Sequence, residues 1–273
     1  MKNYHIAVAM SVYKNDNPKF LYESIISILS QEEVNVTLFI QIDGMISDEL
    51  KKTLILFNEH YNINLFWNKE NKGLATRLNQ IIDEVIKENK FDYLARMDAD
   101  DISHPRRFIT QATFLDIHKD ISVVGSDVIE ISENGEQLFY KKMHSNHDDI
   151  VSNVIQKCPF NHPSVMFNIA VFKENFRYKP SLKNTQDYYL WIDLIFAKKR
   201  LANINLPLLW FRVDNNFHQR RGIQKSLNES FSRIYAIKKL KIYSARNILH
   251  IPLLFMLRIS PEVIKKIAYK KYR

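Results

Sequence analysis

The stretch Tyr-Leu-Ala-Arg-Met-Asp-Ala-Asp-Asp at residues 93–101 decides the fold class. Its first five residues have the length and composition of a buried strand, and Asp98, Asp100 and Asp101 follow at once. Hard cations such as Mg²⁺ or Mn²⁺ favour carboxylate and phosphate oxygens, so an acidic loop at a strand end can hold such a metal against a diphosphate. A solvated acidic loop that caps a helix starting near Pro105 explains the triplet equally well.

Three strand-and-helix units precede this stretch, each beginning with a short apolar run. Apolar strands that alternate with helices predict an α/β fold, with a mostly parallel sheet covered by helices on both faces. Asn17 and Pro18 supply a cap and a first-turn proline for the first helix. Ligands of such sheets bind beyond the carboxyl ends of the strands, where Asp43 and the acidic triplet are expected. The expected strands are 5–12, 36–42, 63–67 and 93–97, and the expected helices are 18–29, 48–60 and 74–87.

The second half of the chain mixes hairpin and helix patterns. Asn134-Gly135 separates two β-rich runs, which is a strong signal for a hairpin. Thr185 is the expected cap of a later helix that is rich in aromatic residues, and basic helices are expected after Arg221. The expected strands are 121–131, 137–140, 162–167 and 204–213, and the expected helix is 187–199.

Composition restricts the class of protein. The chain has 273 residues, of which 46% are hydrophobic and 25% charged, so it can bury a normal core and global disorder is excluded. No apolar run reaches the roughly 18 residues of an ordinary membrane span, and we expect no signal peptide. A single cysteine, Cys158, excludes a disulfide framework and a zinc cluster, and favours the reducing cytosol.

Charge divides the chain near Gly222. The formal net charge is +9, yet residues 223–273 carry 12 basic and 2 acidic residues, while the first 222 residues carry 27 basic and 28 acidic ones. A basic tail on a neutral body indicates a polyanionic partner, either nucleic acid or an anionic lipid surface. We therefore expect a folded body of residues 1–222 and a helical tail of residues 223–273.

Five further positions are candidates for binding. Asp43 ends a strand beside a glycine, and it suits either a contact with a base or ribose or a simple Asp-Gly turn. Lys72 and Arg77 flank the start of a helix after Gly73, which suits phosphate binding, although an ordinary helix start explains them as well. Arg220 and Arg221 suit either a diphosphate clamp or a solvated surface.

Asp187 is the candidate general base. It opens a helix in the stretch Gln186-Asp187-Tyr188-Tyr189-Leu190-Trp191, and we expect Tyr188 and Trp191 to wall a pocket around it. An acid at a helix N-terminus is also explained by the helix dipole alone.

The order of these motifs resembles that of the family 2 glycosyltransferases, which have the GT-A fold. The resemblance covers about residues 4–215 and is closest to the bacterial enzymes that build amylovoran-like exopolysaccharide, O-antigen and lipooligosaccharide chains. The stretches that carry it are Val12-Tyr13-Lys14-Asn15, Asp43-Gly44, Asn71-Lys72-Gly73-Leu74-Ala75, Ala95-Arg96-Met97-Asp98-Ala99-Asp100-Asp101, His162-Pro163-Ser164-Val165-Met166 and Gln186-Asp187-Tyr188-Tyr189-Leu190-Trp191.

The resemblance implies an inverting, metal-dependent enzyme that uses a nucleotide-diphospho-sugar. Residues 1–101 would form a nucleotide-binding half and residues 102–222 an acceptor half of a catalytic domain. Asp100 would bind Mg²⁺ or Mn²⁺ on the diphosphate, and Asp187 would deprotonate the acceptor hydroxyl. The nucleotide-sugar contacts that it implies are Tyr13 and Asp43 to the base, Lys72 and Arg77 in the nucleotide segment, and Asp98 to the ribose or sugar.

Two departures from the family pattern matter. The family usually has Glu-Asp where this chain has Gln186-Asp187, so the presumed base is kept and the first acid is lost. The family often has a histidine after the late Tyr-Arg-Val stretch, where this chain has Asp214. The candidates to replace that diphosphate contact are His218, Arg220 and Arg221.

The expected activity is transfer of a hexose or N-acetylhexosamine from a UDP-sugar to a growing lipopolysaccharide, lipooligosaccharide or exopolysaccharide, with UDP-galactose slightly favoured. A dehydrogenase is disfavoured because no glycine fingerprint follows the first strand. A sugar nucleotidyltransferase normally has a glycine-rich basic loop there, and this chain has Tyr13-Lys14-Asn15-Asp16. The basic tail keeps a nucleic-acid-binding protein open as a third alternative, although we expect no nucleic acid partner.

The tail is expected to bind the cytoplasmic face of the bacterial inner membrane. The apolar stretch 248–259 is too short to span a bilayer, and Ser260-Pro261-Glu262 is expected to start another helix. That helix would have an apolar side flanked by lysines, which is typical of helices that lie in an anionic membrane interface. The alternative is a tail that packs on the catalytic domain. The apolar side is Val263, Ile264, Ile267 and Ala268, and the lysines are Lys265, Lys266, Lys270 and Lys271.

Overall fold

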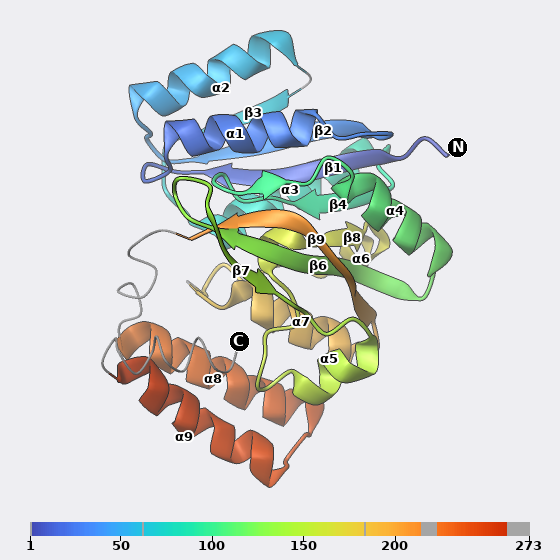
Figure 1. Ribbon diagram of the computed structural model, residues 1–273, viewed down its shortest axis with the longest axis vertical. Helices are drawn as coiled ribbons and strands as arrows, with labels where there is room; N and C mark the ends of the chain where they lie inside the picture. Colours follow the sequence, from blue (N-terminus) through green and yellow to red (C-terminus); the bar gives the residue numbers. More distant parts are fainter. Residues whose placement is uncertain (1, 62, 183, 214–222, 261–273) are drawn as a thin grey trace.

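The computed structural model describes residues 2–61, 63–182, 184–213 and 223–260, and they form a mixed nine-stranded sheet flanked by helices (Figure 1). The strands are β1 (His5–Val12), β2 (Asn35–Asp43), β3 (Ile63–Asn68), β4 (Tyr93–Arg96), β5 (Ile102–Ser103), β6 (Ile121–Ile131), β7 (Gln137–Lys141), β8 (Met166–Asn168) and β9 (Arg200–Arg212). The helices are α1 (Pro18–Leu29), α2 (Asp48–His60), α3 (Leu74–Glu88), α4 (Arg107–Ile117), α5 (His147–Asn153), the 3₁₀ turn η1 (His162–Ser164), α6 (Ala170–Lys173), α7 (Gln186–Phe196), α8 (Ile223–Leu240) and α9 (Ala245–Ile259).

The first half of the chain confirms the predicted α/β pattern. Strands β3, β2, β1 and β4 are neighbours in that order and run parallel. Strand β1 is buried on both faces: Ile6 and Val8 belong to one core cluster, whereas Ala7 belongs to the other. The Asn17 side chain caps α1 by accepting from the backbone N–H of Lys19 at 2.9 Å. Because the strand order reverses between β1 and β4, their carboxyl ends form a crevice there.

The second half adds antiparallel strands to this sheet. Strands β6 and β7 form the predicted hairpin, and β8 inserts antiparallel between β4 and β6. The expected strand over 162–167 is wrong in its first part, because η1 occupies His162–Ser164 and only Met166–Asn168 is extended. Pro163 has no N–H for a sheet ladder, and the Ser164 N–H and Oγ both donate to the Asn161 carbonyl instead.

The C-terminal helices pack on the side of the molecule opposite α1 and α2 (Figure 1). Helix α8 lies against α7, and α9 lies against α8. Asp193 of α7 accepts hydrogen bonds from Lys239 Nζ at 2.5 Å and from the Tyr235 hydroxyl, which ties α8 to the sheet domain. None of the helices in the described part of the chain is long and apolar enough to cross a membrane. The basic helix expected after Ser260 lies outside the described residues.

Candidate active site

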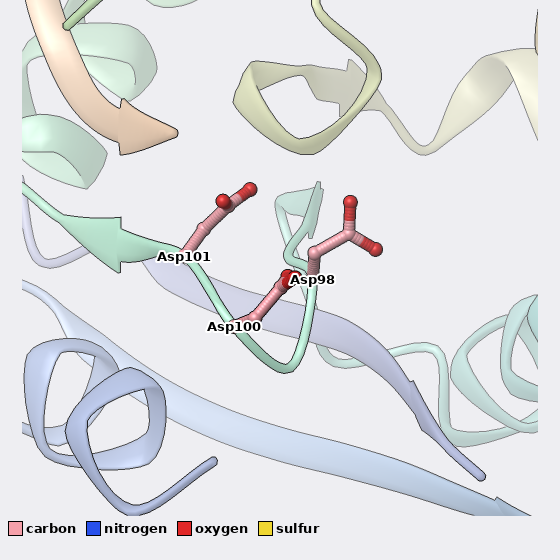
Figure 2. Close-up of side chains that lie close together, drawn as sticks. All are labelled: Asp98, Asp100 and Asp101. Atoms are coloured by element: carbon pink, nitrogen blue, oxygen red, sulfur yellow. The ribbon is translucent and has the colours of Figure 1, made fainter. Parts of the chain in front are cut away.

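The acidic triplet forms the loop between β4 and β5 (Figure 2). Carboxylate oxygens of Asp98, Asp100 and Asp101 lie within 4.8 Å of one another. Arg96, the last residue of β4, forms an ion pair with Asp98. Asp101 is fully buried and accepts from the backbone N–H of Arg212 at 2.9 Å, while its second oxygen has no partner among the described residues.

The electrostatics of this loop suit a divalent cation. Burial and the neighbouring charge of Asp98 raise the pKa of Asp100 to about 6. Burial and the charge of Asp100 raise the pKa of Asp101 well above its usual value. Crowded carboxylates with raised pKa values gain most from a bound cation, and the unpaired oxygen of Asp101 is a ready ligand. The residues present therefore fit Mg²⁺ or Mn²⁺.

A pocket of about 570 Å³ opens above this loop. It brings together four of the predicted contacts from three different strand ends, and it also contains Asp16, which sequence reasoning did not select. Burial raises the pKa of Asp16 to about 7, and one of its oxygens accepts from the backbone N–H of Tyr13 at 2.8 Å. The only sequence signal for Asp16 is that an acidic residue follows shortly after the expected first strand. The four predicted residues are Tyr13, Asp43, Asp98 and Asp100.

Asp43 holds the turn that leads into α3. Its carboxylate accepts from the backbone N–H groups of Lys72 and Gly73 and from Arg77 Nε, at 2.8, 2.9 and 2.6 Å. Gly73 has a φ of +83°, a conformation that glycine adopts without strain. The Arg77 side chain is buried beneath this turn, whereas the Lys72 side chain is exposed and pairs with Glu70 at 3.3 Å.

Asp187 lies at the start of α7 and lines a second pocket of about 410 Å³. Burial raises the pKa of its carboxyl group, and the positive charges of Arg96 and Arg233 oppose that rise. The two pockets adjoin, because Leu74, Asp98, Asn184 and Gln186 line both of them.

The expected walls of the Asp187 pocket are wrong. Tyr188 is buried and donates to the Val154 carbonyl at 2.9 Å, and Trp191 is fully buried against Phe167. Both rings belong to the core because α7 rests on the sheet with its large apolar side chains inward. The pocket is lined instead by residues that come from other elements, namely Leu74, Phe160, Pro163 and Phe211, together with His162.

The predicted capping role of Thr185 is wrong: it precedes α7, but its side chain makes no capping hydrogen bond to any described residue. Arg212, at the end of β9, donates to the Asp100 carbonyl at 2.9 Å and pairs with Glu23 at 2.6 Å, so it braces the acidic loop. The predicted diphosphate contacts, His218, Arg220 and Arg221, lie outside the described residues.

Comparison with known proteins identifies the family. The sequence profile described as "Glycosyl transferase family 2" matches residues 7–176, which is more than half of the chain. The chain belongs to glycosyl transferase family 2. This family 2 protein is therefore a glycosyltransferase, as its motifs predicted. Asp187 lies beyond the matched region.

Two relatives of this family 2 glycosyltransferase come from Escherichia coli. The O-antigen biosynthesis glycosyltransferase WbnJ of Escherichia coli is 30% identical over 237 residues, which cover 86% of this chain and 89% of WbnJ. The UDP-Gal:alpha-D-GlcNAc-diphosphoundecaprenol beta-1,3-galactosyltransferase of Escherichia coli is 26% identical over 273 residues, covering 97% of this chain and 95% of that protein.

Solved structures of glycosyltransferases share the fold. The structure of Staphylococcus aureus TarS in complex with UDP-GlcNAc aligns with a TM-score of 0.61 at 13% identity, over 86% of this chain and 71% of TarS. The mannosyltransferase PcManGT from Pyrobaculum calidifontis, in complex with GDP-Man and Mn²⁺, aligns with a TM-score of 0.59 at 12% identity, over 87% of this chain and 65% of that one. These similarities confirm the predicted GT-A fold.

Proposed function

We propose that this glycosyltransferase transfers a hexose or N-acetylhexosamine from a UDP-sugar to a growing lipopolysaccharide, lipooligosaccharide or exopolysaccharide, with inversion at the anomeric carbon. The observation that supports this most is the shared wall of the two pockets: Asp98 and Asp100 line one, Asp187 lines the other, and Asp98 lines both. A donor sugar at this junction would have a leaving diphosphate on one side and an acceptor hydroxyl on the other.

In this proposal the larger pocket holds the nucleotide. Tyr13 and Asp43 face the base, Asp98 contacts the ribose or sugar, and Asp100 is the principal ligand of Mg²⁺ or Mn²⁺. Bound there, the metal neutralises charge that develops on the leaving diphosphate. Arg77 and the backbone at Lys72 act through Asp43, because they donate to its carboxylate. His218, Arg220 and Arg221 remain proposed diphosphate contacts.

Asp187 is the proposed base. The acceptor hydroxyl attacks the anomeric carbon from the face opposite the diphosphate, and its proton passes to the Asp187 carboxylate as the sugar–phosphate bond breaks. A single displacement of this kind converts an α-linked donor into a β-linked product. The pKa of Asp187, raised by burial, brings its proton affinity closer to neutral pH, where a general base is more effective.

UDP is the proposed nucleotide, and galactose is a slightly favoured sugar. The named activity of the second Escherichia coli relative uses UDP-Gal, and TarS binds UDP-GlcNAc. The lipid-linked acceptor in that relative's name supports a lipid-linked or saccharide acceptor for this chain as well.

The same proposal includes peripheral attachment to the cytoplasmic face of the inner membrane through the tail. Helix α9 exposes Leu249, Leu253, Met256 and Ile259, each at least 50% exposed and spaced to share one face. The charged tail that follows by sequence would add attraction to anionic lipid. A lipid-linked acceptor would lie at that surface.

A panel of nucleotide-sugars tests the proposed reaction. Full-length protein with Mn²⁺ is incubated with UDP-glucose, UDP-galactose, the two UDP-N-acetylhexosamines and GDP-mannose, and nucleoside diphosphate release is measured. Release from a UDP-sugar supports the proposal, whereas release from GDP-mannose alone contradicts the choice of UDP. Pyrophosphate formation from UTP and a sugar phosphate would indicate a nucleotidyltransferase. Salt-dependent binding to arbitrary DNA without any sugar-nucleotide turnover would favour the nucleic-acid alternative.

A further inference from the structure

Three buried polar side chains on the wall of the Asp187 pocket have atoms without a hydrogen-bond partner among the described residues. They are Nε and Nη1 of Arg96, Nδ2 of Asn161 and Oε1 of Gln186. The residues are only 3%, 7% and 8% exposed. A buried polar group without a partner is costly, so native structures rarely tolerate several around one pocket without a ligand to pair them.

Arg107 shows that this fold can satisfy a buried guanidinium. Arg107 is fully buried nearby, and its nitrogens donate to Gln111 Oε1 at 3.0 Å, to Met97 Sδ at 3.4 Å and to the Arg96 carbonyl at 2.9 Å. Among the described residues, the Arg96 side chain forms an ion pair with Asp98 and makes no other hydrogen bond. The difference is that Arg96 lines the pocket and Arg107 does not.

The orientation of Asn161 also leaves a donor for a ligand. Its Oδ1 accepts from Lys141 Nζ at 2.5 Å, which assigns the oxygen to the lysine and leaves the Nδ2 group unpaired. The pocket therefore offers donors from Arg96 and Asn161 and an acceptor from Gln186. The apolar part of the lining consists of Leu74, Phe160, Pro163 and Phe211.

We propose that this pocket is a subsite for an uncharged pyranose of the acceptor, bound by Arg96, Asn161 and Gln186. Arg96 and Asn161 donate to its hydroxyl oxygens, Gln186 accepts from one hydroxyl, and the apolar residues contact its C–H face. The charged residues that line the pocket are Arg96, Asp98 and Asp187. Arg96, the cation of this lining, is already paired with Asp98, and Arg233 acts on Asp187 from outside the lining. The lining therefore offers no unpaired positive charge to an anionic sugar. This inference rests on the proposed function and narrows its acceptor class.

Matched neutral and acidic acceptors test the proposal with the unmodified protein. Full-length protein, Mn²⁺ and the UDP-sugar that it hydrolyses are given p-nitrophenyl glucoside, galactoside or N-acetylglucosaminide, and separately the glucuronide or galacturonide. We expect at least one neutral glycoside to be glycosylated at least 10-fold more efficiently, as kcat/KM, than either uronide. Equal or better use of a uronide overturns the proposal, and so does use of no neutral glycoside by protein that hydrolyses the UDP-sugar. Absence of any UDP-sugar turnover is instead a failure of the proposed function.

Arg96→Lys tests the side chain itself. Lysine keeps a cation for Asp98 but loses the extra guanidinium donors, so we expect the acceptor KM to rise about 10- to 100-fold and at least 10-fold more than the donor KM. Arg107→Lys is the matched control for loss of a buried guanidinium, and its acceptor KM and donor KM should change in parallel. The proposal fails if the two variants show the same pattern. If Arg96→Lys does not fold, as judged by circular dichroism, the neutral and acidic acceptors decide the matter.

Discussion

Arg77 Nε donates to Asp43 Oδ1 at 2.6 Å, and both side chains are almost fully buried. The pair joins the end of β2 to the first turn of α3. The backbone N–H groups of Lys72 and Gly73, in the turn before α3, also donate to this carboxylate. Asp43 thus fixes the turn that forms one wall of the larger pocket, and the positive charge of Arg77 stabilises the buried Asp43 carboxylate.

Removing Arg77 should therefore destabilise the fold. Arg77→Met leaves the Asp43 carboxylate buried without its charge partner, and breaking a buried pair in this way costs about 3–5 kcal/mol. Urea unfolding followed by circular dichroism measures the change. Arg200→Met breaks an exposed pair with Asp120 and should cost less than about 1 kcal/mol. Similar losses for the two variants would contradict a central role for the buried pair.

Asp100→Ala should abolish sugar transfer while the protein stays folded. The variant removes the proposed principal metal ligand, so EDTA should mimic it in the wild type, and Mn²⁺ or Mg²⁺ should restore the wild type only. Asp120→Ala, at an exposed acid away from the loop, is the control and should retain activity. Full wild-type activity in EDTA would exclude the metal assignment.

Asp187→Asn keeps the shape of the side chain and removes its proton affinity. Loss of one general base lowers kcat by about 10²- to 10⁴-fold. The affinity for the donor should change little, because Asp187 lines the acceptor pocket and not the larger one. Isothermal titration with UDP and single-turnover kinetics separate the two effects. If the affinity for the donor collapses and bound donor still reacts, Asp187 belongs to the nucleotide site.

Metal binding should stabilise the protein more at pH 7.5 than at pH 5. The pKa values of Asp100 and Asp16, about 6 and about 7 in the fold, exceed the usual value of 3.8. Their protonation stabilises the metal-free protein in acid, and this contribution is lost as the pH rises from about 4 to 7. Mn²⁺ can take the place of the lost protons only when the carboxylates are ionised. Thermal unfolding with Mn²⁺ and with EDTA across this range measures the difference in Tm, and an Mn²⁺ effect that is constant or larger in acid would contradict the prediction.

Removing residues 244–273 should release the protein from anionic liposomes while UDP-sugar hydrolysis persists. The deletion takes away α9 and the basic residues beyond it but keeps α8, whose Lys239 and Tyr235 contact Asp193. Within the full chain, Leu253→Asp on the exposed face of α9 should weaken binding. Ile117→Asp, at an exposed apolar residue of α4, should not. Flotation of all four proteins decides the matter, and equal binding by the full-length and truncated proteins, or binding by neither, excludes the membrane role.

The sequence by itself determined the local elements and the order of the strand ends. Helix α2 has the predicted bounds and the β6–β7 hairpin follows Asn134-Gly135, because capping residues, apolar periodicity and turn residues act over a few positions. The acidic triplet was evident for the same reason: it follows a buried strand directly. Tyr13, Asp43 and Asp98 could be expected to meet, since parallel strands bring their carboxyl ends to one edge.

Only the tertiary structure decided which side chains face a pocket and which support it. The sequence suggests a phosphate contact for Arg77, but the fold buries its side chain against Asp43. The sequence suggests that Trp191 lines the pocket around Asp187, but the packing of α7 on the sheet buries it in the core. As a residue of a predicted strand, Arg96 is not marked by the sequence as a ligand-binding residue. Its unpaired donors become evident only in the fold, where β4 and η1 line the same cavity. Burial and the meeting of distant segments depend on long-range packing, which no local pattern encodes.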